Sequence, residues 1–135
     1  MAYNIEEIEG IGPATAEKLA KADIKTVEKL LEKGASASGR KGLAETTGLD
    51  AKKILVLVNM ADLMRIKGIG GEFAELLKAS GVDTVKELRN RNAANLAAKM
   101  AEVNEEKKLT RRVPNEGQVQ DFINAAKEME PMVTH

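Results

Sequence analysis

Two glycine-rich turns contain the residues of this chain whose types and spacing could do chemistry. The first turn is Gly10-Ile11-Gly12 and the second turn is Gly68-Ile69-Gly70. Matching residues downstream of the two turns are separated by the same number of positions as the turns themselves. Backbone N–H groups at the start of a helix lack partners within it, so they and the helix dipole attract anions. Glycine lets a phosphate oxygen approach the backbone closely. Such contacts position a protein on nucleic acid without reading its sequence.

The charges around the two turns differ. The first turn stands among Glu6, Glu7, Glu9 and Glu17, with Lys18 further along the chain. The second turn follows Arg65 and Lys67 but precedes Glu72 and Glu75. Because carboxylates repel phosphate, we expect the second turn to be the better anion site. Its expected contacts are Arg65, Lys67, Gly68, Ile69, Gly70 and Gly71.

The densest positive segment runs from Lys107 to Arg112 and is a secondary candidate for phosphate contact. Its arginines could instead pair with Glu105 and Glu106 or with acidic residues of the first half. Two further basic pairs, Arg40-Lys41 and Lys52-Lys53, are expected to be solvated helix faces. The full set of predicted nucleic-acid-binding residues is Arg65, Lys67, Gly68, Ile69, Gly70, Gly71, Gly10, Ile11, Gly12, Lys18, Arg111 and Arg112.

The composition argues against most other classes of function. Lys and Arg number 21 and so do Asp and Glu, so the basic excess of a typical DNA-binding domain is missing. The chain has no cysteine, and its single histidine is His135, so no metal site and no cofactor are expected. Nothing singles out a catalytic group, and we expect a non-enzyme without a small-molecule ligand. Without a signal peptide or a long apolar run, a cytoplasmic protein is expected.

Apolar spacing and capping residues predict helices throughout, so the fold class is all-α. Pro13 suits a first helical position, Asp50 suits an N-cap, and the stretch 35–39 has the composition of a loop. A mostly apolar helix over 51–65 is expected to be buried and to join the two halves. The other predicted helices are 13–22, 26–34, 40–47, 72–79, 84–89, 93–107 and 115–129.

Both turns resemble the helix-hairpin-helix motif of DNA repair and recombination proteins. The motif's later alanine and leucine correspond to Ala16 and Leu19 after the first turn, and to Ala74 and Leu77 after the second. Three longer phrases, at 58–70, 81–88 and 111–114, look like a bacterial family catalogued as a domain of unknown function. These resemblances imply a pseudo-twofold tandem helix-hairpin-helix fold, and they imply no established activity.

The expected organisation is a single compact unit over 1–135, with one repeat at 4–64 and the other at 65–130. Two functions remain open. The chain could bind DNA weakly and without sequence preference, through hairpin amides and backbone phosphates. Alternatively, it could be a protein-interaction or scaffold module that keeps the fold without binding DNA. The neutral charge balance favours the second reading and the repeated turn favours the first.

Overall fold

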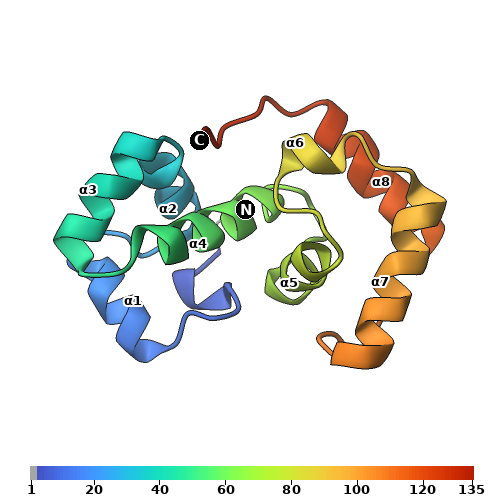
Figure 1. Cartoon of the computed structure of the whole chain (residues 1–135), viewed down its shortest axis with the longest axis horizontal. Helices are drawn as coiled ribbons and strands as arrows, with labels where there is room; N and C mark the ends of the chain where they lie inside the picture. The colour runs from blue at the N-terminus through green and yellow to red at the C-terminus, as the bar shows by residue number, and fades with distance from the viewer. Residues whose placement is uncertain (1–2) are drawn as a thin grey trace. The chain divides into compact units, whose positions relative to one another are not determined.

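The computed structural model describes residues 3–135, and every regular element in that range is a helix (Figure 1). The all-α prediction is therefore confirmed for this range. An isolated antiparallel bridge joins Asn4 to Thr26. The elements are the 3₁₀ helix η1 (Ile5–Glu7) and the α-helices α1 (Pro13–Ala20), α2 (Val27–Gly34), α3 (Ala37–Thr47), α4 (Ala51–Leu63), α5 (Gly71–Ala79), α6 (Val85–Leu88), α7 (Ala93–Lys107) and α8 (Glu116–Lys127).

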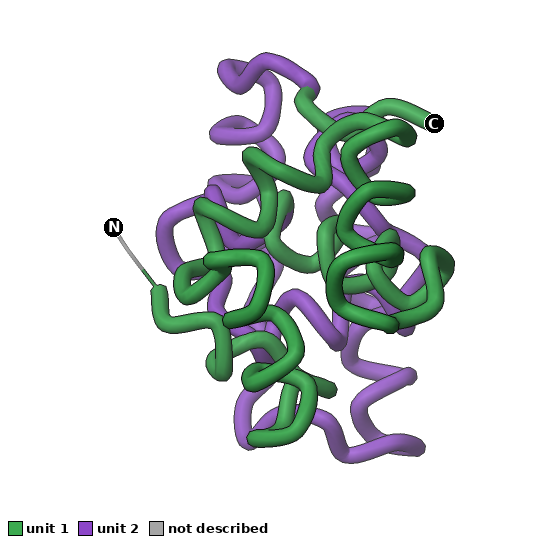
Figure 2. Tube along the Cα trace, turned by 90° about the vertical axis from the view of Figure 1, so that its left-hand side faces the viewer, with its two compact units in different colours: residues 1–62, 132–135 green, residues 63–131 purple. Residues whose placement is uncertain are grey.

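The chain divides into two compact units, coloured separately in Figure 2. Unit 1 consists of the residues up to Asp62 together with 132–135, and unit 2 consists of residues 63–131. Each unit contains one of the two glycine-rich turns. The C-terminal segment thus belongs to the same unit as the start of the chain, a pairing that no local sequence pattern predicts.

The core of unit 1 forms where isoleucine and leucine side chains from the turn and its helices meet. Ile8, Leu19 and Ile24 are at most 1% exposed, and Ile54 of α4 is fully buried. Local signals define the helix ends: Thr26 accepts a hydrogen bond at the start of α2, and Gly48 ends α3 with a φ of 77°. This left-handed conformation favours glycine, because a Cβ would be strained there.

Arg40 corrects the prediction of a solvated basic pair, because its side chain is buried. Its guanidinium donates hydrogen bonds to the carbonyls of Gly34 and Ala35, at 2.9 and 3.0 Å, and to the carbonyl of Thr134. The N–H of Thr134 in turn donates to the carbonyl of Ala35 at 2.8 Å. Arg40 therefore satisfies the end of α2 and fastens the C-terminal segment within unit 1, whereas Lys41 is exposed as expected.

The loop predicted over 35–39 is wrong in its second half, since α3 begins at Ala37. Ser36 is the cause: its hydroxyl accepts a hydrogen bond from the N–H of Gly39 at 3.0 Å and so caps the helix. A Cβ at Gly39 would lie 2.2 Å from the carbonyl oxygen of Lys33, so this glycine permits a close backbone approach. A small-residue stretch reads as a loop by composition, yet here it starts a helix.

Unit 2 packs α8 against α6 and α7, and α5 against α7. Val119, Phe122, Ile123 and Ala126 are buried, as their spacing predicts. Asn115 and Gln118 form a capping box at the start of α8. The predicted helix ends were off by a few residues: α4 stops at Leu63 and α8 at Lys127.

Candidate nucleic-acid interface

The two turns have closely matching backbones. Gly10 has a φ of 95° and Gly68 a φ of 96°, values at which an L side chain is strained. The central isoleucines face inward: Ile11 is 6% exposed and Ile69 is fully buried. Both isoleucines were predicted as contact residues, and their burial leaves only their backbone groups available to a ligand.

The second glycine of each turn is the N-cap of the following helix. Gly12 and Gly70 have φ values of −94° and −98° with extended ψ, a conformation that any residue adopts. A Cβ at either position would meet nothing within 4 Å. Neither cap supplies a side-chain hydrogen bond to its helix, so the first-turn N–H groups remain open to an outside acceptor.

The number of available N–H groups differs between the two helices. Proline has no N–H, and α1 begins with Pro13, whereas α5 begins with Gly71. The first N–H to bond back within each helix belongs to Ala16 and Ala74, which donate to the carbonyls of Gly12 and Gly70 at 2.9 Å. The start of α5 therefore presents one more N–H than the start of α1.

The electrostatic surroundings also differ. Near the first turn, Glu6, Glu9 and Glu17 are exposed. Near the second turn, the exposed charges are Lys67 before the glycines and Glu72 in the first turn of α5. A phosphate at the start of α5 would thus meet one cation and one carboxylate, and at the start of α1 it would meet mainly carboxylates.

Two basic residues predicted at the turns lie less favourably than their sequence positions suggest. Arg65 is half-buried, and its guanidinium donates a hydrogen bond to the carbonyl of Glu130 at 3.0 Å, within unit 2. Lys18 is exposed but belongs to the last turn of α1. With a rise of about 1.5 Å per residue, it stands about 8 Å along the axis from Pro13. Of the basic residues predicted at the two turns, Lys67, before α5, is the best placed to contact an anion at its own helix start.

The basic segment of unit 2, residues 107–112, has a defined shape. The side chain of Asn104 pairs with Thr110 in both directions, accepting from its N–H at 2.9 Å and donating to its carbonyl at 3.1 Å. The Thr110 hydroxyl donates to the carbonyl of Arg112. Arg111 and Arg112 are exposed on this braced loop. Asparagine near a helix end signals such bracing, but its partner six residues on could not be read from the sequence.

Between Tyr3 and His135, no group of three or more His, Cys, Asp or Glu side chains is placed to hold a metal ion. In the same range, no helix has the length and apolar character needed to cross a bilayer.

Comparison with known proteins assigns the family but no activity. Neither the curated proteins nor the solved structures include a significant match to this chain. A family profile described as a domain of unknown function, DUF4332, matches residues 9–129. This match spans both turns and all of α1 to α8, and the chain therefore belongs to the DUF4332 family.

Proposed function

We propose that this chain is a non-catalytic, cytoplasmic protein of the helix-hairpin-helix type that binds DNA through its backbone phosphates, at the start of α5. The observation that carries the proposal is Gly70. Its backbone conformation and its open surroundings do not require glycine, and a side chain there would only cover the first N–H groups of α5. A glycine that the fold does not need is explained by a ligand that approaches the backbone closely.

The neighbouring residues support the same position. Gly71 keeps an N–H that a proline would remove, and exposed Lys67 adds a positive charge before the turn. The Glu72 carboxylate repels a phosphate, so we expect binding to DNA to be weak. Since phosphate contacts carry no base information, binding is independent of sequence. One hairpin engages few phosphates, and each phosphate contributes a slope of about −0.9 to the dependence of log affinity on log salt concentration.

The test is a fluorescence anisotropy titration of a short labelled duplex at low salt. We expect a dissociation constant within the non-specific range of about 10⁻⁴ to 10⁻⁶ M. Lys67→Glu should weaken binding by about tenfold, because it replaces an attraction to phosphate with a repulsion.

Lys18→Glu is the matched control, since it makes the same charge change at an exposed position on α1. It should weaken binding by less than about threefold. The proposal fails if the unmodified protein does not bind at about 100 µM, the weak end of the non-specific range. It also fails if the two substitutions weaken binding equally, because the effect would then follow net charge and not the second turn.

A further inference from the structure

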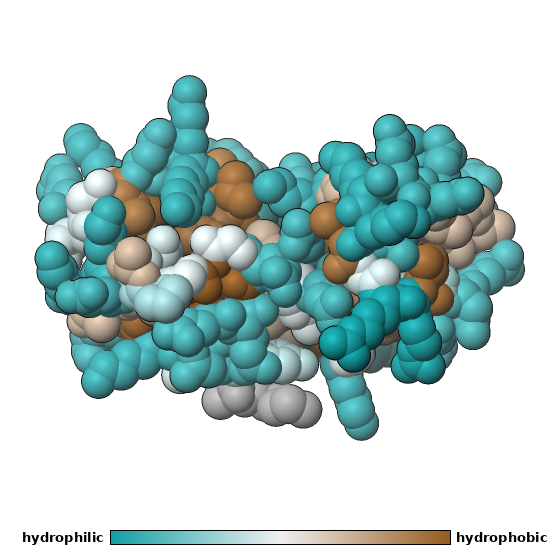
Figure 3. Space-filling view, turned by 90° about the horizontal axis from the view of Figure 1, so that it is seen from below, coloured by the Kyte–Doolittle hydropathy of each residue, from teal (hydrophilic) through white to brown (hydrophobic). Residues whose placement is uncertain are grey.

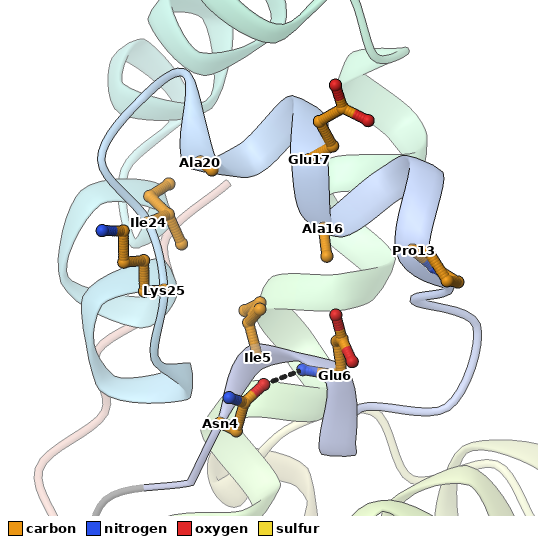
Figure 4. Close-up of a pocket in the computed structure, with 9 residues that line it drawn as sticks. All are labelled: Asn4, Ile5, Glu6, Pro13, Ala16, Glu17, Ala20, Ile24 and Lys25. Carbon is orange, nitrogen blue, oxygen red and sulfur yellow. Dashed lines mark hydrogen bonds between the residues drawn. The ribbon is translucent and has the colours of Figure 1, made fainter.

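Unit 1 contains a groove of about 390 Å³ between η1, α1 and the segment before α2 (Figure 4). Its apolar lining comes from Ile5, Pro13, Ala16, Ala20 and Ile24. Asn4, Glu6, Glu17 and Lys25 complete the lining. The groove has the size of a site for one or two side chains.

The groove is open because α1 carries small residues on the side that faces it. Ala16 and Ala20 lie one helical turn apart and so share one face of the helix, as Figure 4 shows. Ile5 and Ile24 are 4% and 0% exposed and form a floor that is already packed beneath the opening. Figure 3 shows apolar side chains visible between hydrophilic ones on the face that carries η1 and α1. A further aliphatic side chain could bury its surface here.

Backbone and side-chain hydrogen bonds hold the walls in place. The N–H of Ile5 donates to the carbonyl of Lys25 at 3.1 Å, which ties η1 to the opposite wall. The Asn4 side chain accepts from the N–H of Glu6 at 2.9 Å, and the Glu7 carboxylate accepts from the N–H of Asn4 at 2.8 Å. A preformed groove spares a ligand the cost of ordering it.

Two carboxylates of the groove lining have no interaction partner among the described residues. Glu6 and Glu17 are exposed, and neither carboxylate makes a hydrogen bond or ion pair with any residue between Tyr3 and His135. Glu7 differs, because its carboxylate is used in the cap of η1. A ligand that neutralises Glu6 and Glu17 would therefore displace no existing interaction. These charges repel phosphate, so the groove does not suit nucleic acid.

We infer that this groove docks a basic segment of a partner protein. One aliphatic side chain of that segment packs among Pro13, Ala16 and Ala20, above the buried Ile5 and Ile24, and flanking Lys or Arg side chains contact Glu6 and Glu17. Lys25 also lines the groove, so two carboxylates against one cation leave the rim with a net negative charge. The apolar floor and this negative rim together fit this chemistry, since each addresses a different part of such a segment. This activity is separate from DNA binding at the start of α5 and does not depend on it.

The probe is a fluorescein-labelled basic peptide with one leucine, Arg-Lys-Leu-Lys-Arg, a sequence that does not occur in this chain, titrated with the full chain. Glu6→Lys combined with Glu17→Lys should weaken its binding by at least about tenfold. The matched control combines Glu32→Lys with Glu45→Lys, which makes the same charge change at exposed positions of unit 1 outside the groove. This control should weaken binding by less than about threefold.

The apolar part is tested by changing the peptide's leucine to serine, which should weaken binding by about fivefold or more. Circular dichroism melts verify that each variant folds. The inference is overturned if the control pair weakens binding as much as the groove pair, or if the serine peptide binds equally well. Self-association of the chain that the groove pair abolishes would also overturn it, because a second copy would then be the occupant. The DNA titration with Lys67→Glu reports separately on the second turn.

Discussion

In the first turn Gly10 has a φ of 95°, and in the second turn Gly68 has a φ of 96°, yet Pro13 opens the next helix in one and Gly71 in the other. The same backbone is thus placed in two chemical settings. The start of α1 lacks an N–H and faces carboxylates, and the start of α5 keeps its N–H beside Lys67. A shared turn geometry is therefore evidence that the two copies fold alike. The function of each copy depends on the residues that flank its turn.

The two glycines within one turn also differ in what they do. Gly10 and Gly68 are required by their positive φ. Gly12 and Gly70 have ordinary φ values and open surroundings, so packing does not require them. Substitution of the first glycine of each pair should therefore lower the free energy of unfolding. Substitution of the second glycine should instead change the affinity for any ligand.

The largest expected effect is on stability and separates the two turns. Gly68→Ala should lower the free energy of unfolding by about 2–3 kcal/mol, because it combines backbone strain with an added Cβ 3.2 Å from the Phe122 ring. Gly10→Ala should cost about 1–2 kcal/mol, since it adds strain without a steric contact. Urea unfolding followed by circular dichroism measures both changes.

Phe122→Leu provides the control for that difference. In its background the additional cost of Gly68→Ala should shrink, while the cost of Gly10→Ala should not change. If Gly68→Ala and Gly10→Ala lowered the unfolding free energy of the unmodified chain equally, the Phe122 ring would move aside at no energetic cost. The expected difference in packing between the two turns would then be wrong.

Local signals account for what the sequence predicted well. Pro13 at a first helical position, Gly48 after a helix and Asp50 before one each act on adjacent backbone groups, and each lies where its chemistry predicts. Helix identity and the position of the two turns are therefore readable from a single chain.

Contacts between distant residues account for what could not be predicted. Arg40 is buried because the end of α2 and Thr134 both supply carbonyls to it, and those groups lie far apart in the sequence. The groove beside Ala16 depends on the backbone hydrogen bond from Ile5 to Lys25, which the spacing of residues in the sequence does not predict. Burial of a charged side chain and the opening of a groove are properties of tertiary packing.

A second, smaller effect tests whether the open glycines bind an anion. Gly70→Asp should weaken duplex binding by about tenfold, since it places a carboxylate where the phosphate would approach. Gly12→Asp should have less than about threefold effect, because Glu6, Glu9 and Glu17 already repel phosphate there. Aspartate is a favourable N-cap, so neither substitution should lower stability.

Gly70→Asn serves as the uncharged counterpart in the same anisotropy titration. It should weaken binding by an intermediate factor, through steric cover of the first N–H groups alone. If Gly70→Asp and Gly12→Asp weakened binding equally, phosphate would not distinguish the two helix starts, and the assignment to α5 would be wrong.

The smallest effect isolates a single N–H group. Gly71→Pro gives α5 the first residue that α1 has, and it should weaken duplex binding by about threefold. Proline is well tolerated at a first helical position, and the extended ψ of Gly70, −166°, suits a residue before proline, so the unfolding free energy should not fall. The reciprocal change, Pro13→Ala, adds an N–H to α1 and should raise affinity by less than about twofold, because the surrounding carboxylates persist. An unchanged affinity for Gly71→Pro would show that the N–H of Gly71 does not contact phosphate, leaving Lys67 as the source of any preference for the second turn.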